Sequence, residues 1–229
     1  MDTSLRALAA TAALTAAVPA QALVLIDQLY LAQPGVGIAG TISDFDRPFQ
    51  IADGFAVATS TPVAITRIEW TGRSSQGLND FSDGPPLDSF RVRIFHDHGG
   101  EPGKNPFLDL DVSGLFTESP TAVAAQSLFS VTLPRRAVLS GQEFFLSIVA
   151  NTPATENHWS WTWTNGPTMS YDRVLDGDPW NLRGLRSYSF RLIGDSVRVP
   201  EPGTLLLFTL GVLGLVMPVI GGNKVRTEQ

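Results

Sequence analysis

The sequence predicts an all-β protein, built as an antiparallel β-sandwich of the jelly-roll type, with an N-terminal signal peptide and a C-terminal single transmembrane helix. Three observations lead to this prediction. Between the termini, short segments alternate apolar and polar residues or are rich in β-branched and aromatic types. Turn-forming clusters separate these segments, and the chain has 16 prolines and 21 glycines to supply them. Both termini carry an uncharged apolar run.

The N-terminal segment has the organisation of a signal peptide. One arginine lies in residues 1–6, an alanine-rich apolar run follows at residues 7–18, and the sequence Ala-Gln-Ala at residues 20–22 fits the small-x-small cleavage rule. An amphipathic first helix is the alternative, but the run has no continuous polar stripe. We therefore expect residues 1–22 to be removed and the protein to be exported.

Residues 23–198 form the predicted β domain. No segment in it has a helical period, and we expect roughly eight to ten strands from the patterning. The clearest strands lie at 48–57, 63–71, 89–96, 127–133, 143–150, 158–164 and 188–194. The expected turns lie at 53–54, 83–86, 99–103, 165–167 and 176–179.

The C-terminal region, residues 199–229, begins with two prolines and contains an uncharged run from Thr204 to Ile220. With two further glycines this run is a transmembrane segment of about 204–222, which as a helix reaches roughly 26 to 28 Å, just enough for a thin hydrocarbon core. A buried core helix is the alternative, but an all-apolar helix has little to pack against in a β-rich chain. Lys224 and Arg226, in the tail 223–229, would stay in the cytoplasm and retain the chain in the membrane.

The order of these features is specific. Pro200, Glu201 and Pro202 directly precede the apolar run and the basic tail. The region resembles the PEP-CTERM sorting signal of exported Gram-negative proteins. The resemblance implies transient tethering in the inner membrane, recognition by an exosortase-type membrane protease at Pro-Glu-Pro, and release toward the cell surface. Tails in that family usually carry a denser arginine cluster.

The middle of the chain also resembles a β-sandwich domain that is common in proteins with this signal. Its landmarks are IADGFAV, ITRIEW, FRVRIFHDHGGEPG, SGQEFFLSIV, HWSWTW and the closing W-x7-YSFRL. No agreed biochemical activity comes with that domain. The resemblance therefore supports the fold and transfers no catalytic residue.

Composition excludes several classes of function. The net charge is -6 and the basic residues are scattered, which argues against nucleic acid as a partner. The chain has no cysteine, so it has no disulfide, no Cys-ligated zinc and no thiol nucleophile. A GxGxxG match at residues 35–40 is not followed by a helical pattern, and no other catalytic motif is present. We expect no enzymatic activity and name no catalytic residue.

Tryptophans are the main candidates for ligand contact. Trp159, Trp161 and Trp163 share one face of a strand, which is more simply a buried face than a sugar-stacking platform. Trp70 and Trp180 follow strand ends or turns, where exposed aromatic rings could contact carbohydrate.

Metal sites have weaker support. His96 and His98 share a strand face but lack a third ligand for zinc, and a polar strand end explains them as well. Loop carboxylates leave room for one structural calcium ion, with no other cofactor expected. These carboxylates are Asp80 and Asp83, or Asp172, Asp176 and Asp178.

The sequence thus predicts an exported protein of the cell surface or extracellular matrix, structural or adhesive in an exopolysaccharide context. Its expected partners are an exosortase-type protease, the inner membrane during sorting, and exopolysaccharide. A carbohydrate-binding module is the alternative, and a polysaccharide hydrolase or lyase is a third hypothesis.

Overall fold

The computed structural model describes residues 22–30, 39–44, 49–57, 59, 61–76, 87, 89–123, 126–151 and 157–197. The chain divides into two units after Ser196, and the described residues belong, apart from Val197, to the first. The predicted signal peptide, apart from Ala22, and the sorting region 199–229 lie outside the described residues. Within the described part of the chain, no helix has the length and apolar character needed to cross a membrane.

The described secondary structure is β throughout, which confirms the predicted all-β class. The strands are β1 (Leu23–Asp27), β2 (Ala39–Ile42), β3 (Gln50–Ala56), β4 (Val63–Gln76), β5 (Phe90–His96), β6 (Leu108–Asp111), β7 (Phe116–Pro120), β8 (Ser127–Leu139), β9 (Glu143–Ala150), β10 (Asn157–Arg173), β11 (Asn181–Tyr188) and β12 (Phe190–Ser196).

Hydrogen bonds link these strands into one twelve-stranded sheet, in the order β1-β12-β4-β10-β3-β9-β5-β6. The strands β2 and β11 add to β10, β8 pairs with β4, and β7 pairs with β8. Every pairing between named strands is antiparallel. Because one continuous ladder joins all the strands, the two-sheet jelly-roll sandwich stays a prediction.

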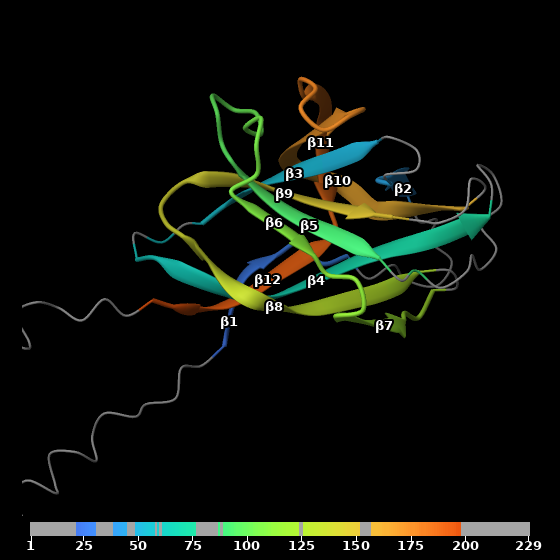
Figure 1. Ribbon diagram of the computed structural model, residues 1–229, viewed down its shortest axis with the longest axis horizontal. Coiled ribbons are helices and arrows are strands. Elements are labelled where there is room, and N and C mark those ends of the chain that lie inside the picture. The colour runs from blue at the N-terminus through green and yellow to red at the C-terminus, as the bar shows by residue number, and fades with distance from the viewer. Residues whose placement is uncertain are drawn as a thin grey trace, which may run out of the picture. The chain divides into compact units, whose positions relative to one another are not determined.

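The core lies where the two halves of this sheet face each other. Figure 1 shows β3, β9 and β5 on one side and β12, β4 and β8 on the other. Phe55 of β3 meets Phe190 of β12 at 5.9 Å between ring centroids, and Trp70 of β4 meets Phe90 of β5 at 5.2 Å. Burying a side chain of this size contributes about 1.5 to 3 kcal/mol to the free energy of unfolding. The chain has no cysteine, so this burial and not disulfide bonding stabilises the fold.

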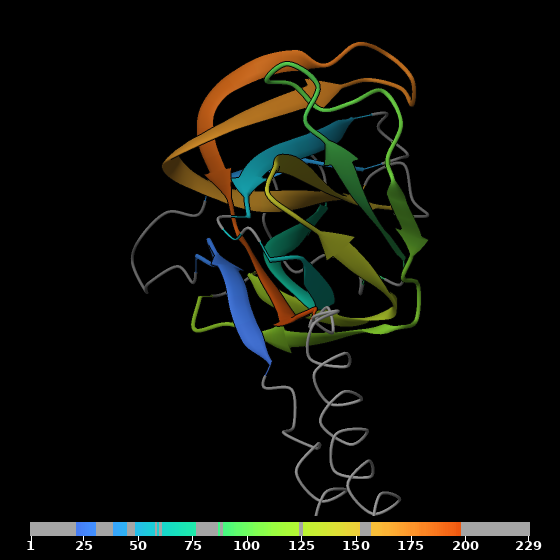
Figure 2. The ribbon, with the colours of Figure 1, turned by 90° about the vertical axis from the view of Figure 1, so that its left-hand side faces the viewer.

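The longest strand, β10, organises the region of interest. Its first half pairs with β4 and β2, and its second half pairs with β3 and β11. The turn predicted at 165–167 is wrong, because these residues lie within β10 at a register shift between Asn165 and Met169. An irregularity of this kind accommodates Pro167, which has no N–H for the ladder. Figure 2 shows β10 and β11 curving strongly together.

Two other predicted turns are confirmed, and one is wrong. The 99–103 loop bends at Gly99 and Gly100, whose φ angles of 74° and 94° favour glycine. The 176–179 segment forms the connection between β10 and β11. The pair at 53–54 lies inside β3 instead, where Asp53 is paired with Leu146 and Ser170.

Candidate functional site

One groove crosses the sheet where β2, β10 and β11 run side by side. Trp163 of β10 lies there between Ala39 of β2 and Tyr188 of β11. The groove has a volume of about 480 Å³, which is within the usual range for ligand sites. We call it the Trp163 groove. It is lined mainly by Thr41, Ile42, Phe49, Trp163, Arg183 and Arg186.

Each arginine of the Trp163 groove stacks on an aromatic ring. The Arg186 guanidinium carbon lies 4.4 Å from the centroid of Trp163, and that of Arg183 lies 5.1 Å from the centroid of Phe49. The attraction between a cation and an aromatic face orients a flexible arginine side chain. All four side chains are partly exposed, so the two guanidinium groups are held in place and remain in contact with solvent.

Hydrogen-bond donors outnumber acceptors in this groove. Arg183 Nε pairs with Asp172 Oδ2 at 2.7 Å, but Arg183 Nη1 and Trp163 Nε1 have no acceptor among the described residues. Arg186 forms no ion pair with any carboxylate in the described part of the chain. The hydroxyl of Thr41 already accepts a hydrogen bond from Tyr188 Oη at 2.9 Å. Arg186 therefore gives the groove an accessible donor group and excess positive charge, whereas Arg183 Nη1 and Trp163 Nε1 are buried.

A buried carboxyl group is connected to the Trp163 groove through Tyr188. Asp53 is fully buried, and its Oδ2 accepts a hydrogen bond from the Tyr188 N–H at 2.8 Å. Burial raises the pKa of Asp53 well above its ordinary value, although the hydrogen bond from Tyr188 opposes the rise. Its Oδ1 has no partner within the described residues. The group is costly to ionise and has no contact with solvent.

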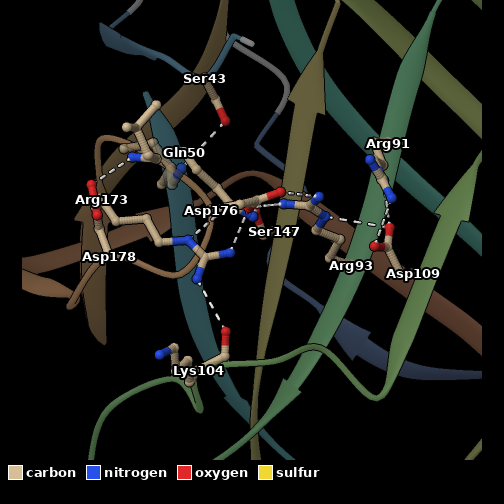
Figure 3. A network of polar contacts seen from close by, with 12 residues as sticks. Ser43, Gln50, Arg91, Arg93, Lys104, Asp109, Ser147, Arg173, Asp176 and Asp178 are labelled. Atoms are coloured by element: carbon tan, nitrogen blue, oxygen red, sulfur yellow. Dashed lines mark hydrogen bonds and ion pairs between the residues drawn. The ribbon is translucent and has the colours of Figure 1, made fainter. Parts of the chain in front are cut away.

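A second polar assembly holds the connection between β10 and β11 against the sheet. We call Gln50, Arg93, Arg173 and Asp176 the Arg173 cluster (Figure 3). Both arginines are buried, and the Asp176 carboxylate bridges them, with 2.5 Å to Arg93 Nη1 and 2.8 Å to Arg173 Nη2. Gln50 Oε1 accepts from Arg173 Nε at 2.7 Å and from Arg93 Nη1 at 3.2 Å. Each buried guanidinium therefore has both a carboxylate and an amide partner.

The pKa shifts agree with this geometry. The hydrogen bonds from Arg93 hold the pKa of Asp176 below its ordinary value, and the nearby charges of Arg93 and Arg173 add to the effect. Burial lowers the pKa of Arg173, and Asp176 opposes that shift. The ordinary pKa of arginine is so high that Arg173 stays charged at neutral pH, and Asp176, whose pKa is lowered, is ionised there too. The Arg173 cluster is therefore a charged network that holds the β10–β11 connection against the sheet.

Three side chains of β10 and of the connection that follows it donate hydrogen bonds to backbone carbonyls of the 97–107 loop. Tyr171 Oη donates to the carbonyl of Gly100 at 2.5 Å, Arg173 Nη1 to that of Lys104 at 3.2 Å, and Trp180 Nε1 to that of Gly103 at 3.3 Å. These bonds fix the loop to the β10–β11 connection. A hollow of about 490 Å³ lies between the two segments.

Trp180 lines this second hollow, together with charged side chains of both signs. It is only 9% exposed. The Arg173 guanidinium covers its ring at 4.4 Å, and Phe95 meets it edge to face at 5.4 Å. Contact between Trp180 and carbohydrate stays a prediction. The Arg173 guanidinium weakens it, because it covers a face of the ring on which a sugar would stack.

The expectation that Trp70 is exposed is wrong. Trp70 is 0% exposed, and it stacks on Phe129 at 5.6 Å. The sequence suggested a strand end at residue 71, but β4 continues to Gln76, so Trp70 lies in mid-strand and faces the core. It has no surface at which a sugar could bind.

The HWSWTW face behaves as predicted for two of its three indoles. Trp159 and Trp161 are fully buried, whereas Trp163 is partly exposed at the groove. On the opposite face, Thr162 is also fully buried and lies 3.5 Å from Gln126 Nε2. Both faces of the strand are therefore covered at this point.

Among the residues that the structure describes, the candidate metal ligands do not converge. His96 stacks on Phe107 at 4.4 Å, and Asp172 and Asp176 are each bound to arginine. Within the described residues, no three His, Cys, Asp or Glu side chains are grouped so that they could hold a metal ion. Asp80 and Asp83 lie outside those residues, so the calcium ion stays a prediction.

The predicted sorting residues Pro200, Glu201, Pro202, Lys224 and Arg226 also lie outside the described residues. Sequence reasoning missed the groove residues Phe49, Arg183 and Arg186. Arg183 and Arg186 are three residues apart, which does not match the period of two of a regular strand, so the NLRGLRSY pattern did not predict a strand that presents both cations. Nothing in the sequence indicated that this strand would lie beside Trp163.

Comparisons with known proteins add one finding. The family model of the PEP-CTERM protein-sorting motif matches residues 198–217. No curated protein and no solved structure matches the chain with significance.

Proposed function

Since the chain carries a PEP-CTERM sorting signal at residues 198–217, we propose that it is an exported protein of the cell surface or extracellular matrix, with a structural or adhesive role. The match to the sorting motif is the observation that carries this proposal. Such signals are processed by exosortase, a membrane protease, which makes an exosortase the expected processing partner. The membrane is the expected location before processing.

The finer parts of the proposal concern the two ends and the fold. Residues 1–22 act as a cleaved signal peptide, and residues 204–222 hold the chain in the inner membrane until the Pro-Glu-Pro region is cut. The β domain is a jelly-roll-like sandwich whose two halves enclose one core. The contacts of Phe55 with Phe190 and of Trp70 with Phe90 across that core support this description.

A rigid, noncatalytic β domain suits a structural or adhesive role. The Arg173 cluster fixes the 97–107 loop to the β10–β11 connection, and each of its buried guanidinium groups is already paired. A structural calcium ion is not needed for this arrangement, since Asp176 serves two arginines instead.

Carbohydrate binding is the second candidate function, and the Trp163 groove favours it. Because Arg186 covers the Trp163 ring at 4.4 Å, the oriented guanidinium groups rather than the indole face would contact a sugar, through its acidic substituents. A polysaccharide hydrolase or lyase would need two facing carboxylates or a Tyr and His pair in a groove. The described lining of the Trp163 groove contains neither pair.

Cell fractionation tests the proposed function. The full chain should be found in the surface or extracellular fraction, and a variant that lacks residues 199–229 should be released into the periplasm without membrane retention. A third variant, with Pro200-Glu201-Pro202 replaced by alanines, should accumulate in the inner membrane. Equal distribution of all three forms would contradict sorting by this signal.

A further inference from the structure

We propose that the Trp163 groove binds a carboxylate-bearing sugar residue of an acidic polysaccharide, with Arg186 as the principal contact. This inference rests on the proposed function, because it takes the ligand from the polymers that surround an exported protein. It goes further by assigning the binding surface, the chemical class of the ligand and the residue that recognises it.

The first argument is the balance of donors and acceptors. The partly exposed Arg186 guanidinium forms no ion pair with a described carboxylate. Two buried donors beside it, Arg183 Nη1 and Trp163 Nε1, have no acceptor among the described residues. A ligand that fits must therefore bring acceptors, and a carboxylate offers two oxygens in the geometry that a guanidinium fork prefers. A neutral sugar, which donates as often as it accepts, would match this lining less well.

The second argument is the orientation of Arg186. Its guanidinium lies over Trp163 at 4.4 Å, and this fixes its position before any ligand arrives. An arginine that is already ordered loses less side-chain entropy on binding, which favours affinity. The neighbouring Arg183 is neutralised by Asp172 at 2.7 Å, so the excess positive charge belongs to Arg186.

The third argument concerns size and selectivity. A volume of about 480 Å³ is too large for a single small ion and accommodates a sugar ring with its substituents. The whole chain carries a net charge of -6, so a polyanion is repelled by most of the protein and attracted only at a local positive site. Binding of an acidic polymer would therefore report on the groove and not on general charge.

The test uses the full chain, purified in a non-ionic detergent, and isothermal titration calorimetry at low ionic strength. Three probes separate the alternatives: polygalacturonate, fully methyl-esterified polygalacturonate and polyglutamate. The first should bind, and the ester should bind at least about tenfold more weakly because its carboxylates are blocked. Polyglutamate, which is acidic but has no sugar ring, should also bind at least about tenfold more weakly.

The variants assign the binding to the groove. Arg186→Gln should weaken binding of polygalacturonate about tenfold, and Arg186→Lys should give an intermediate loss because the charge is kept without the planar fork. Arg135→Gln is the matched control, since it removes the same charge from an exposed arginine of β8. Near-ultraviolet circular dichroism confirms that each variant is folded, and Arg186→Lys serves if Arg186→Gln is not.

Several outcomes would overturn the inference. These are no binding of polygalacturonate, equal binding of its methyl ester, equal binding of polyglutamate, and equal losses in Arg186→Gln and Arg135→Gln. Equal binding of polyglutamate would mean that the groove recognises charge or an acidic peptide. Because fractionation is measured separately, a chain that reaches the surface but fails to bind refutes the inference and leaves the proposed function standing.

Discussion

Replacing Arg173 by methionine tests the Arg173 cluster. The guanidinium is 1% exposed and donates to Gln50 Oε1 at 2.7 Å, Asp176 Oδ1 at 2.8 Å and the Lys104 carbonyl at 3.2 Å. Removing one member of a buried ion pair typically costs 3 to 5 kcal/mol. Methionine refills much of the volume, Arg93 still binds Asp176, and water can reach that half-exposed carboxylate. We therefore expect a loss of about 3 kcal/mol, at the lower end of that range.

The matched control is Arg91→Met. Arg91 also pairs with a carboxylate, through bonds of 2.6 and 2.9 Å to Asp109, but its side chain is 44% exposed. Exposed pairs contribute about 1 kcal/mol or less. Urea unfolding followed by tryptophan fluorescence measures both variants, and Trp180, which lies against Arg173, reports directly on the site. Equal losses in the two variants would refute the structural role assigned to the cluster.

The remaining predictions concern single buried positions. Since the folded pKa of Asp53 is raised, its stabilising effect is complete below the unfolded pKa of about 3.9 and is lost as pH rises through the folded pKa. Asp53→Asn should therefore be more stable than the parent at pH 7, and the gain should vanish in acid. A constant difference in stability across a pH series of unfolding curves would argue against this. Gly72→Ala should cost about 1 to 3 kcal/mol, because the new methyl group lies 2.5 Å from the Trp159 ring in the core. Gly103→Ala, where the nearest atom is 3.4 Å away, should change the melting temperature far less, and similar shifts in the two variants would count against the packing described.

The long strands of the fold were predictable because their patterns are strong. All seven predicted strands have counterparts, for example 143–150 in β9 and 63–71 in β4. The strands β1, β2, β6, β7 and β11 were missed. Four of them have five residues or fewer, too short for alternation to stand out. The fifth, β11, reads as a loop because Gly184 interrupts it.

The errors around β10 have a common physical cause. Asn165, Gly166 and Pro167 form a strong local turn signal, but pairing with β11 on both sides of them keeps the strand continuous. In the same way, pairing with the first residues of β10 extends β4 past Trp70, whose side chain is buried. The local sequence marked residues 165–167 and Trp70 as unusual. Only the pairing with distant strands determined that the first stay within a strand and that the second is buried.

The candidate site was less predictable than the fold. The three indoles of β10 were expected to share one face, but which of them would reach the surface depends on the neighbouring strands. Arg186 is 23 residues from Trp163 in sequence and stacks on it only because β11 returns beside β10. A single sequence carries no record of that register.

The central claim is that the chain is sorted to the surface through its C-terminal signal. Mass spectrometry of the intact protein from the surface fraction tests it most directly. The account predicts a mature chain whose C-terminus lies near residues 200–204, and a surface protein that still ends at Gln229 would contradict it.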